Sequence, residues 1–154
     1  MRKLEPPFRA EHIGSLLRPR SVKDAARALR ENAISEADYL AIIDAETKRL
    51  VKRQEDLGLQ MVTDGELSRS TWFGFFFERM EGFSAEKAVF QFHDDEGNDF
   101  DFLTSYSKSR MQRRSSICQR DYQRLHNAAT VTPKFTIPAP SAFHFFRGDA
   151  CRNS

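Results

Sequence analysis

The first half of the chain carries two stretches in which apolar residues recur at helical spacing. In the first, Ser21 is followed three residues later by Asp24, the pattern of a helix-capping box. Residues 32–34 (Asn-Ala-Ile) interrupt the periodicity, so a helix is predicted over 21–31. The apolar positions that define this helix are Val22, Ala25, Ala26 and Leu29.

The second stretch predicts a longer helix over 35–57. Ser35 with Asp38 repeats the capping pattern, and Gly58 supplies a C-terminal stop because glycine readily adopts the left-handed conformation. One apolar stripe is expected to face the core; it consists of Leu40, Ile43, Leu50, Val51 and Leu57.

Three short apolar runs, at about 8–14, 59–64 and 134–138, are predicted to be strands. Helices separate the first two runs, and a strand–helix–strand crossover favours parallel pairing. Parallel strands place their carboxyl ends at one edge of the sheet, where ligands bind in this class of fold. Residues 12–15 and 64–66 follow the first two runs, so their side chains are predicted to converge.

Residues 83–120 are predicted to form an insertion after the second strand. The segment 95–98 (Asp-Glu-Gly-Asn) suits a hairpin turn, with aromatic residues on both sides of it. These flanking residues are Phe90, Phe92, Phe100 and Phe102. A further helix is expected over 121–129, after the insertion.

Charge is unevenly placed around this insertion. An acidic group is followed closely by a basic group; the two consist of Asp94, Asp95, Glu96, Asp99 and Asp101, and of Lys108, Arg110, Arg113, Arg114, Arg120 and Arg124. The basic group, with Tyr106 and Tyr122 nearby, is compatible with nucleic-acid binding or with a solvated face of the fold. The net charge of +2 and the pI of 8.6 favour the solvated face, and no nucleic-acid partner is predicted.

Composition limits the class of protein. The chain has 154 residues, of which 40% are hydrophobic and 30% charged, as expected for one folded domain over 1–154. There is no apolar run of about 18 residues and no signal-peptide pattern, so no membrane segment and a cytoplasmic location are expected. Cys118 and Cys151 are too isolated for a disulfide framework or a CxxC metal site.

Three ordered motifs resemble the cobalamin-independent methionine synthase family, and more closely its single-barrel, methionine synthase II-like members. The first motif is Phe8-Arg9-Ala10-Glu11-His12-Ile13-Gly14-Ser15-Leu16-Leu17-Arg18-Pro19. The second contains Gln54-Glu55, Gly58-Leu59, Thr63-Asp64-Gly65-Glu66, Arg69 and Trp72. The third is Pro133-Lys134-Phe135-Thr136-Ile137-Pro138-Ala139-Pro140-Ser141.

The resemblance implies an α/β fold, the N-terminal half of a (β/α)8 TIM barrel. A complete barrel needs about 250 residues, so a chain of 154 residues covers only part of one. The resemblance also implies transfer of a methyl group from a methyl-folate to the thiol of homocysteine. In the family a zinc ion serves this reaction, because it stabilises the thiolate nucleophile at neutral pH.

The resemblance further implies a substrate-binding role for Ile13, Gly14, Ser15 and Glu66, with His12 lining the same site. Gly14 allows close backbone approach, and the Ser15 hydroxyl can donate to a substrate carboxylate. Glu66 can pair with a substrate ammonium group.

Other residues near the motifs keep two interpretations. Asp64 is expected to brace its loop, while Arg18 and Arg69 could bind a carboxylate or the folate tail, or form structural salt bridges. Trp72 and the phenylalanines after it could stack on a pteridine-like ring or belong to the core. His144 is a further residue that could face the site.

The sequence departs from the family in one chemical respect. The zinc ligands that the family takes from later strands have no match before Ser154, and 148–154 is an atypical tail. We therefore predict no catalytic residue and no metal ligand in this chain, and no methyl transfer by the chain alone. Self-association through an open barrel edge is expected. A non-catalytic binding or assembly module and a related thiol alkyltransferase are the alternative functions.

Overall fold

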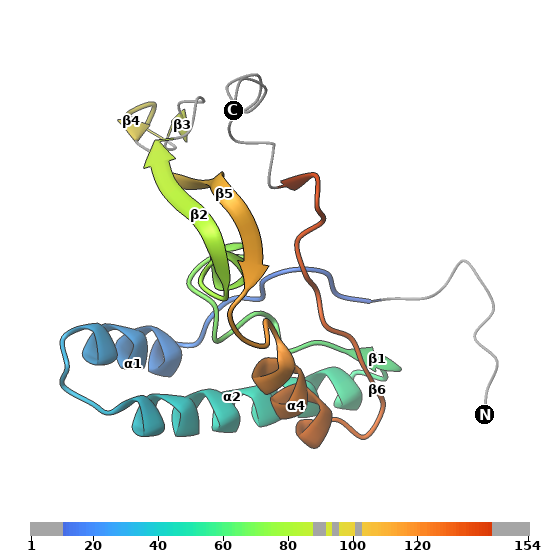
Figure 1. The fold of residues 1–154 in the computed structure, drawn as a ribbon. Helices are drawn as coiled ribbons and strands as arrows, with labels where there is room; N and C mark the ends of the chain where they lie inside the picture. The colour runs from blue at the N-terminus through green and yellow to red at the C-terminus, as the bar shows by residue number, and fades with distance from the viewer. Residues whose placement is uncertain (1–10, 88–91, 94–95, 101–102, 143–154) are drawn as a thin grey trace. The chain divides into compact units, whose positions relative to one another are not determined.

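The computed structural model describes residues 11–87, 92–93, 96–100 and 103–142 (Figure 1). The elements follow one another as α1 (Arg20–Arg30), α2 (Glu36–Asp56), β1 (Met61–Val62), α3 (Gly74–Phe77), β2 (Met80–Lys87), β3 (Phe92–His93), β4 (Asp99–Phe100), β5 (Leu103–Arg113), α4 (Gln119–Ala128) and β6 (Thr132–Pro133). They form two compact units. One holds the described residues up to Trp72 together with Cys118–Thr136, and the other holds the described residues of 73–117 and 137–142.

The first unit contains one parallel strand pair, which joins the second and third of the three predicted strand regions rather than the first and second. β1 pairs with β6 in parallel, with Met61 opposite Thr132 and Val62 opposite Pro133. The Lys134 N–H donates to the Val62 carbonyl at 2.8 Å and extends this ladder by one bond. The strand expected at 134–138 is wrong in its bounds: β6 ends at Pro133, and residues 134–138 form no strand.

The strand expected over 8–14 is wrong for residues 11–14, which form no strand, while residues 8–10 lie outside the described part. Two features explain the difference. Gly14 has φ +80°, which interrupts an extended backbone. The side-chain amide of Gln54 also occupies the strand edge at Thr63, donating to the Thr63 carbonyl at 2.8 Å and accepting from its N–H at 3.1 Å.

The helices of the first unit confirm the predicted periodicity. Two details differ from the prediction: the exposure of Leu57 at the end of α2, and the cap at the start of α1. α2 begins with the predicted capping box, in which the Ser35 hydroxyl accepts from the Asp38 N–H and the Asp38 carboxylate accepts from the Ser35 N–H. At its C-terminal end Gly58 has φ +83°, as expected of the stop residue. Leu57, however, is 72% exposed because it lies at the C-cap, beyond the buried stripe.

The capping box predicted at the start of α1 is wrong. The helix begins at Arg20 with Pro19 as the N-cap, and no side chain caps it. Ser21 therefore lies inside the helix and donates instead to Glu46 at 2.6 Å, while Asp24 pairs with Arg27. Proline can serve here because its fixed φ is already compatible with helix entry.

The core of this unit forms where α2, β1 and α4 meet. Val51, Val62 and Leu125 are buried there, and partly buried apolar residues pack around them: Ala128, Ala129, Val131 and Phe135. α1 and α2 lie side by side, and α4 contacts α2 (Figure 1). α4 itself agrees with the helix predicted over 121–129.

The second unit is built on an antiparallel hairpin. β2 pairs with β5 from Met80 opposite Arg113 to Lys87 opposite Leu103. β3 pairs with β4, with Phe92 opposite Phe100, which confirms the hairpin turn predicted between them. Phe90 and Phe102 lie outside the described residues.

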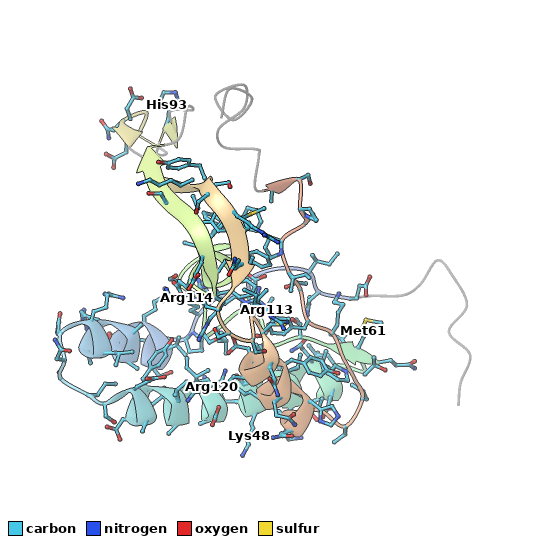
Figure 2. All side chains as sticks on the ribbon, in the orientation of Figure 1. Lys48, Met61, His93, Arg113, Arg114 and Arg120 are labelled. Atoms are coloured by element: carbon cyan, nitrogen blue, oxygen red, sulfur yellow. The ribbon has the colours of Figure 1, made fainter. Side chains whose placement is uncertain are left out.

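Some residues of the basic group form ion pairs, and the two described next are with acids that do not belong to the acidic group. Arg114 lies 3.4 Å from Glu81, and Arg120 lies 3.0 Å from Glu36. Figure 2 labels both arginines among the side chains of the chain. Within the acidic group, Asp99 contacts His93 at 2.6 Å.

Phe73 and Phe75 are buried, and Phe73, Phe76 and Phe83 each pack edge-on against Phe77. This packing agrees with the core interpretation of the aromatic stretch.

The α/β fold and the parallel pairing confirm the predicted fold class. A single domain over 1–154 stays a prediction. The tail at 148–154, together with His144 and Cys151, lies outside the described residues.

Candidate functional site

The candidate site is the turn that follows β1, residues Thr63–Arg69, which we call the β1 turn. Gly65 and Glu66 both have left-handed backbone conformations, with φ +60° and +57°. A Cβ on Gly65 would lie 2.8 Å from a methyl carbon of Leu50 and 3.0 Å from the Leu16 Cβ, so both the close packing and the positive φ favour glycine there. For Glu66 the conformation costs free energy, and such strain concentrates at functional sites.

Asp64 holds Glu66 in this conformation. Its Oδ1 accepts from the Glu66 N–H at 3.1 Å, closing an Asx-type turn. The structure thus places Asp64 in the bracing position that the sequence suggests. Burial raises the pKa of the Asp64 carboxyl, and the Glu66 N–H and the Arg69 charge partly oppose that rise.

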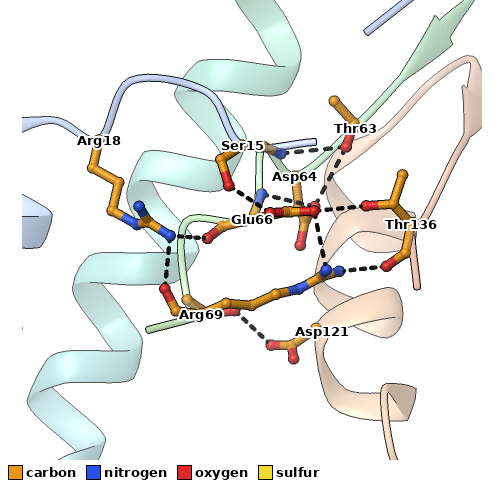
Figure 3. Close-up of polar contacts among 10 residues, drawn as sticks. Ser15, Arg18, Thr63, Asp64, Glu66, Arg69, Asp121 and Thr136 are labelled. Carbon is orange, nitrogen blue, oxygen red and sulfur yellow. Dashed lines mark hydrogen bonds and ion pairs between the residues drawn. The ribbon is translucent and has the colours of Figure 1, made fainter. Parts of the chain in front are cut away.

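The carboxylate of Glu66 is buried and accepts from three side chains (Figure 3). Its Oε1 accepts from Arg69 Nη1 at 3.2 Å and from Thr136 Oγ1 at 3.0 Å. Its Oε2 accepts from Ser15 Oγ at 2.5 Å. The two motifs that hold Ser15 and Glu66 therefore meet, although residues 11–14 do not form the strand on which the crossover argument relied.

Two arginines, Arg18 and Arg69, hold the β1 turn through hydrogen bonds to backbone carbonyls. Arg18 donates to the carbonyls of Glu66 and Arg69, at 3.2 and 2.7 Å. Arg69 is buried, donates to the Thr136 carbonyl at 2.9 Å and lies over the Phe135 ring. Both arginines thus make the structural contacts that one of their two interpretations expects.

Residues 12–16 attach to the β1 turn without forming a strand. The Leu16 N–H donates to the Gly65 carbonyl at 3.0 Å. His12 Nδ1 lies 3.3 Å from Gln54 Oε1, so the contact of His12 is with α2 rather than with Glu66. The same Gln54 amide also bonds Thr63, so it links His12 of the first motif to Thr63 of the second.

The remaining predicted residues lie at the exposed edge of this arrangement. Ser15 is exposed, and Ile13 is 78% exposed. A Cβ on Gly14 would meet nothing within 4 Å, so its positive φ, rather than crowding, calls for glycine here. The described residues thus leave open space beside Gly14, and the neighbouring Ser15 is exposed.

Two residues of the site received no role from the sequence. Thr136 bonds Glu66 across a separation of 70 residues, and Gln54 bonds Thr63 across the end of α2. Both belong to the motifs of the resemblance, which was the only signal that pointed to them.

Zinc does not fit the side chains that the structure describes. Among the described residues there is no group of three or more His, Cys, Asp or Glu side chains able to hold a metal ion. Cys118 is a free, half-buried thiol. Within the described part of the chain, no helix combines the length and apolarity needed to cross a membrane.

Comparison with known proteins identifies the family. Residues 8–92 match the family model described as "Cobalamin-independent synthase, Catalytic domain". The chain belongs to the cobalamin-independent methionine synthase family. A 5-methyltetrahydropteroyltriglutamate–homocysteine methyltransferase of Lactiplantibacillus plantarum is 40% identical over 73 residues, 47% of this chain and 10% of that protein.

Longer matches support the same family. The uncharacterized protein YxjH of Bacillus subtilis is 36% identical over 145 residues, 90% of this chain and 37% of YxjH. A structure from Listeria monocytogenes, provisionally assigned as a vitamin-B12-independent methionine synthase, is 25% identical with a TM-score of 0.71 over 94% of this chain. The chain spans 40% of that protein. It therefore corresponds to part of the barrel of this TIM-barrel family.

Proposed function

We propose that this chain supplies the amino-acid-binding part of a methyltransferase that transfers a methyl group from a methyl-folate to the thiol of homocysteine. The carrying observation is the 2.5 Å bond between Ser15 Oγ and Glu66 Oε2, which brings two family motifs to one point. The name of the L. plantarum relative, a homocysteine methyltransferase, supports the substrate class.

The pair suits a zwitterionic amino acid. Without substrate, the Ser15 hydroxyl donates to Glu66 Oε2. A substrate ammonium group can replace that hydroxyl as the donor, which frees Ser15 to donate to the substrate carboxylate. The exchange conserves hydrogen bonds, so the buried carboxylate stays paired in both states.

We do not assign the methyl-transfer step to any of the described side chains. In the family, zinc supplies stabilisation of the substrate thiolate, but the described side chains offer no ligand group for it. The proposed contribution of this chain is to bind and orient homocysteine, and we expect no methyl transfer from it alone.

Calorimetric titration of the chain with L-homocysteine tests this proposal. Glu66→Gln should weaken binding by about 1.5–3 kcal/mol, the range for a hydrogen bond to a charged group. The matched control is Glu31→Gln, which changes an exposed glutamate at the C-cap of α1 and should leave the affinity unchanged.

The desamino analogue, 4-sulfanylbutanoic acid, provides a second comparison. The unaltered chain should bind homocysteine more tightly than this analogue, because only homocysteine carries an ammonium group for Glu66. Equal binding of the two compounds, or unchanged homocysteine affinity in Glu66→Gln, would contradict the proposed function.

A further inference from the structure

The two oxygens of the Glu66 carboxylate have different surroundings. A carboxylate oxygen offers about two lone-pair sites. Oε1 uses both, for Arg69 Nη1 at 3.2 Å and Thr136 Oγ1 at 3.0 Å. Among the described residues, Oε2 accepts from Ser15 alone.

Thr136 and Arg69 are also bonded to each other. Arg69 Nη2 donates to the Thr136 carbonyl at 2.9 Å, while the Thr136 hydroxyl donates to Glu66. Arg69 in turn donates to Glu66, so the three residues close a ring of hydrogen bonds (Figure 3). The ring fixes both the position and the plane of the carboxylate.

The ring is anchored independently on both sides. On one side, the Lys134 N–H donates to the Val62 carbonyl, which holds the segment after β6 against β1. On the other, Arg69 is buried with its guanidinium 4.4 Å from the centre of the Phe135 ring. The branched Cβ of Thr136 restricts its side-chain rotamers, so its hydroxyl is directed with little freedom.

We propose that Thr136 and Arg69 are positioning residues that block Oε1 of Glu66 and leave Oε2, beside Ser15, as the acceptor for a substrate ammonium group. This inference rests on the proposed function. It adds that selection of a ligand with an ammonium group depends on the hydroxyl of Thr136, which lies 70 residues after Glu66 in the sequence.

The test measures the affinities of four chains for L-homocysteine and 4-sulfanylbutanoic acid by calorimetry. Thr136→Val keeps the shape and removes the hydroxyl, whereas Thr136→Ser keeps the hydroxyl. Thr136→Val should bind homocysteine about 3- to 10-fold more weakly, the effect of one hydrogen bond, with binding of the analogue unchanged. Thr136→Ser should bind both compounds like the unaltered chain.

Arg69→Lys serves as the third variant, because a lysine cannot donate in the fork geometry that bridges Glu66 and Thr136. It should also lose preference for homocysteine over the analogue. Far-ultraviolet circular dichroism establishes that each variant is folded.

The outcomes separate the two proposals. If the unaltered chain does not prefer homocysteine over the analogue, the proposed function fails and this inference fails with it. If the unaltered chain has that preference but Thr136→Val keeps it, only the positioning role is overturned. Equal weakening of both compounds in Thr136→Val would also overturn it, since that result indicates a general loss of structure.

Discussion

The β1 turn and the β2–β5 hairpin are stabilised in opposite ways. In the β1 turn, side chains bond residues far apart in the sequence: Ser15 to Glu66 across 51 positions and Thr136 to Glu66 across 70. In the hairpin, backbone pairing in register joins the strands, from Phe83 opposite Ser107 to Lys87 opposite Leu103.

Burial follows the same division. Residues 62–67 of the β1 turn region are all buried, whereas residues 107–116 of the hairpin arm and the loop after it are all exposed. A buried polar group is costly unless it is bonded, so the β1 turn must satisfy its groups in one arrangement. The exposed hairpin arm can exchange its partners with water. The comparison indicates that buried polar side chains hold the β1 turn in one arrangement, whereas the exposed hairpin arm is less constrained. The next four experiments test this difference between buried and exposed parts of the chain.

The largest expected effect is on the free energy of unfolding, and it compares a core position of the first unit with an exposed position of the hairpin. Leu125→Ala removes a fully buried side chain beside Val51 and Val62, and should lower the free energy of unfolding by about 2–5 kcal/mol. Met111→Ala, at a hairpin position that is 51% exposed, should change it by less than about 0.5 kcal/mol. Urea unfolding followed by circular dichroism measures both. Similar losses in the two variants would remove the contrast.

The hairpin has one crowded position, and a pair of glycine variants tests it. A Cβ on Gly82 would lie 2.7 Å from the Arg110 carbonyl oxygen, whereas a Cβ on Gly97 would meet nothing within 4 Å. Both glycines have positive φ, so alanine at either should cost about 1–2 kcal/mol of strain. Gly82→Ala should cost more, because the backbone it meets must move.

Amide hydrogen exchange reports this difference directly. The amides of β2 and β5 should lose protection in Gly82→Ala and keep it in Gly97→Ala. Equal protection in the two variants would show that the irregular register between Glu81 and Phe83 absorbs the added methyl group.

A smaller effect is expected at the helix starts. Ser35→Ala removes a complete capping box from α2 and should cost about 1 kcal/mol. Ser21→Ala removes only an exposed contact with Glu46, since α1 has no side-chain cap, and should cost less than about 0.5 kcal/mol. Thermal unfolding of both variants measures the difference, and a larger loss for Ser21→Ala would contradict the structure.

The last prediction concerns the pH dependence of the β1 turn. Because burial raises the pKa of Asp64 from 3.8, the folded chain retains a proton there that the unfolded chain has released. The contribution of Asp64 to stability therefore falls as the pH rises from about 3.8 to the folded pKa, and is constant above it.

Asp64→Asn should remove that fall while keeping an acceptor for the Glu66 N–H. Urea unfolding of both chains between about pH 3.5 and pH 7 measures the difference in the pH dependence of their unfolding free energies. An identical pH dependence would mean that Asp64 is not buried as described.

Local features of the chain were predictable from the sequence because their causes are local. The helical periodicity gives α1, α2 and α4, and the capping box at Ser35 and the stop at Gly58 need only adjacent residues. The turn between β3 and β4 belongs to the same class. The choice of Ser21 as a cap failed because Pro19 already started the helix.

The meeting of Ser15 with Glu66 was also predictable, from the family resemblance, which gives both residues a role in one site. The absence of a strand at 11–14 was not predictable, because it depends on Gln54, which bonds the backbone groups of Thr63 that such a strand would use. The part played by Thr136 was equally hidden. The sequence by itself determined which segments become helices and which motifs carry the site. Only the tertiary structure decided which oxygen of Glu66 accepts two hydrogen bonds and which accepts one, because folding brings Thr136 and Ser15 to the carboxylate from distant parts of the chain.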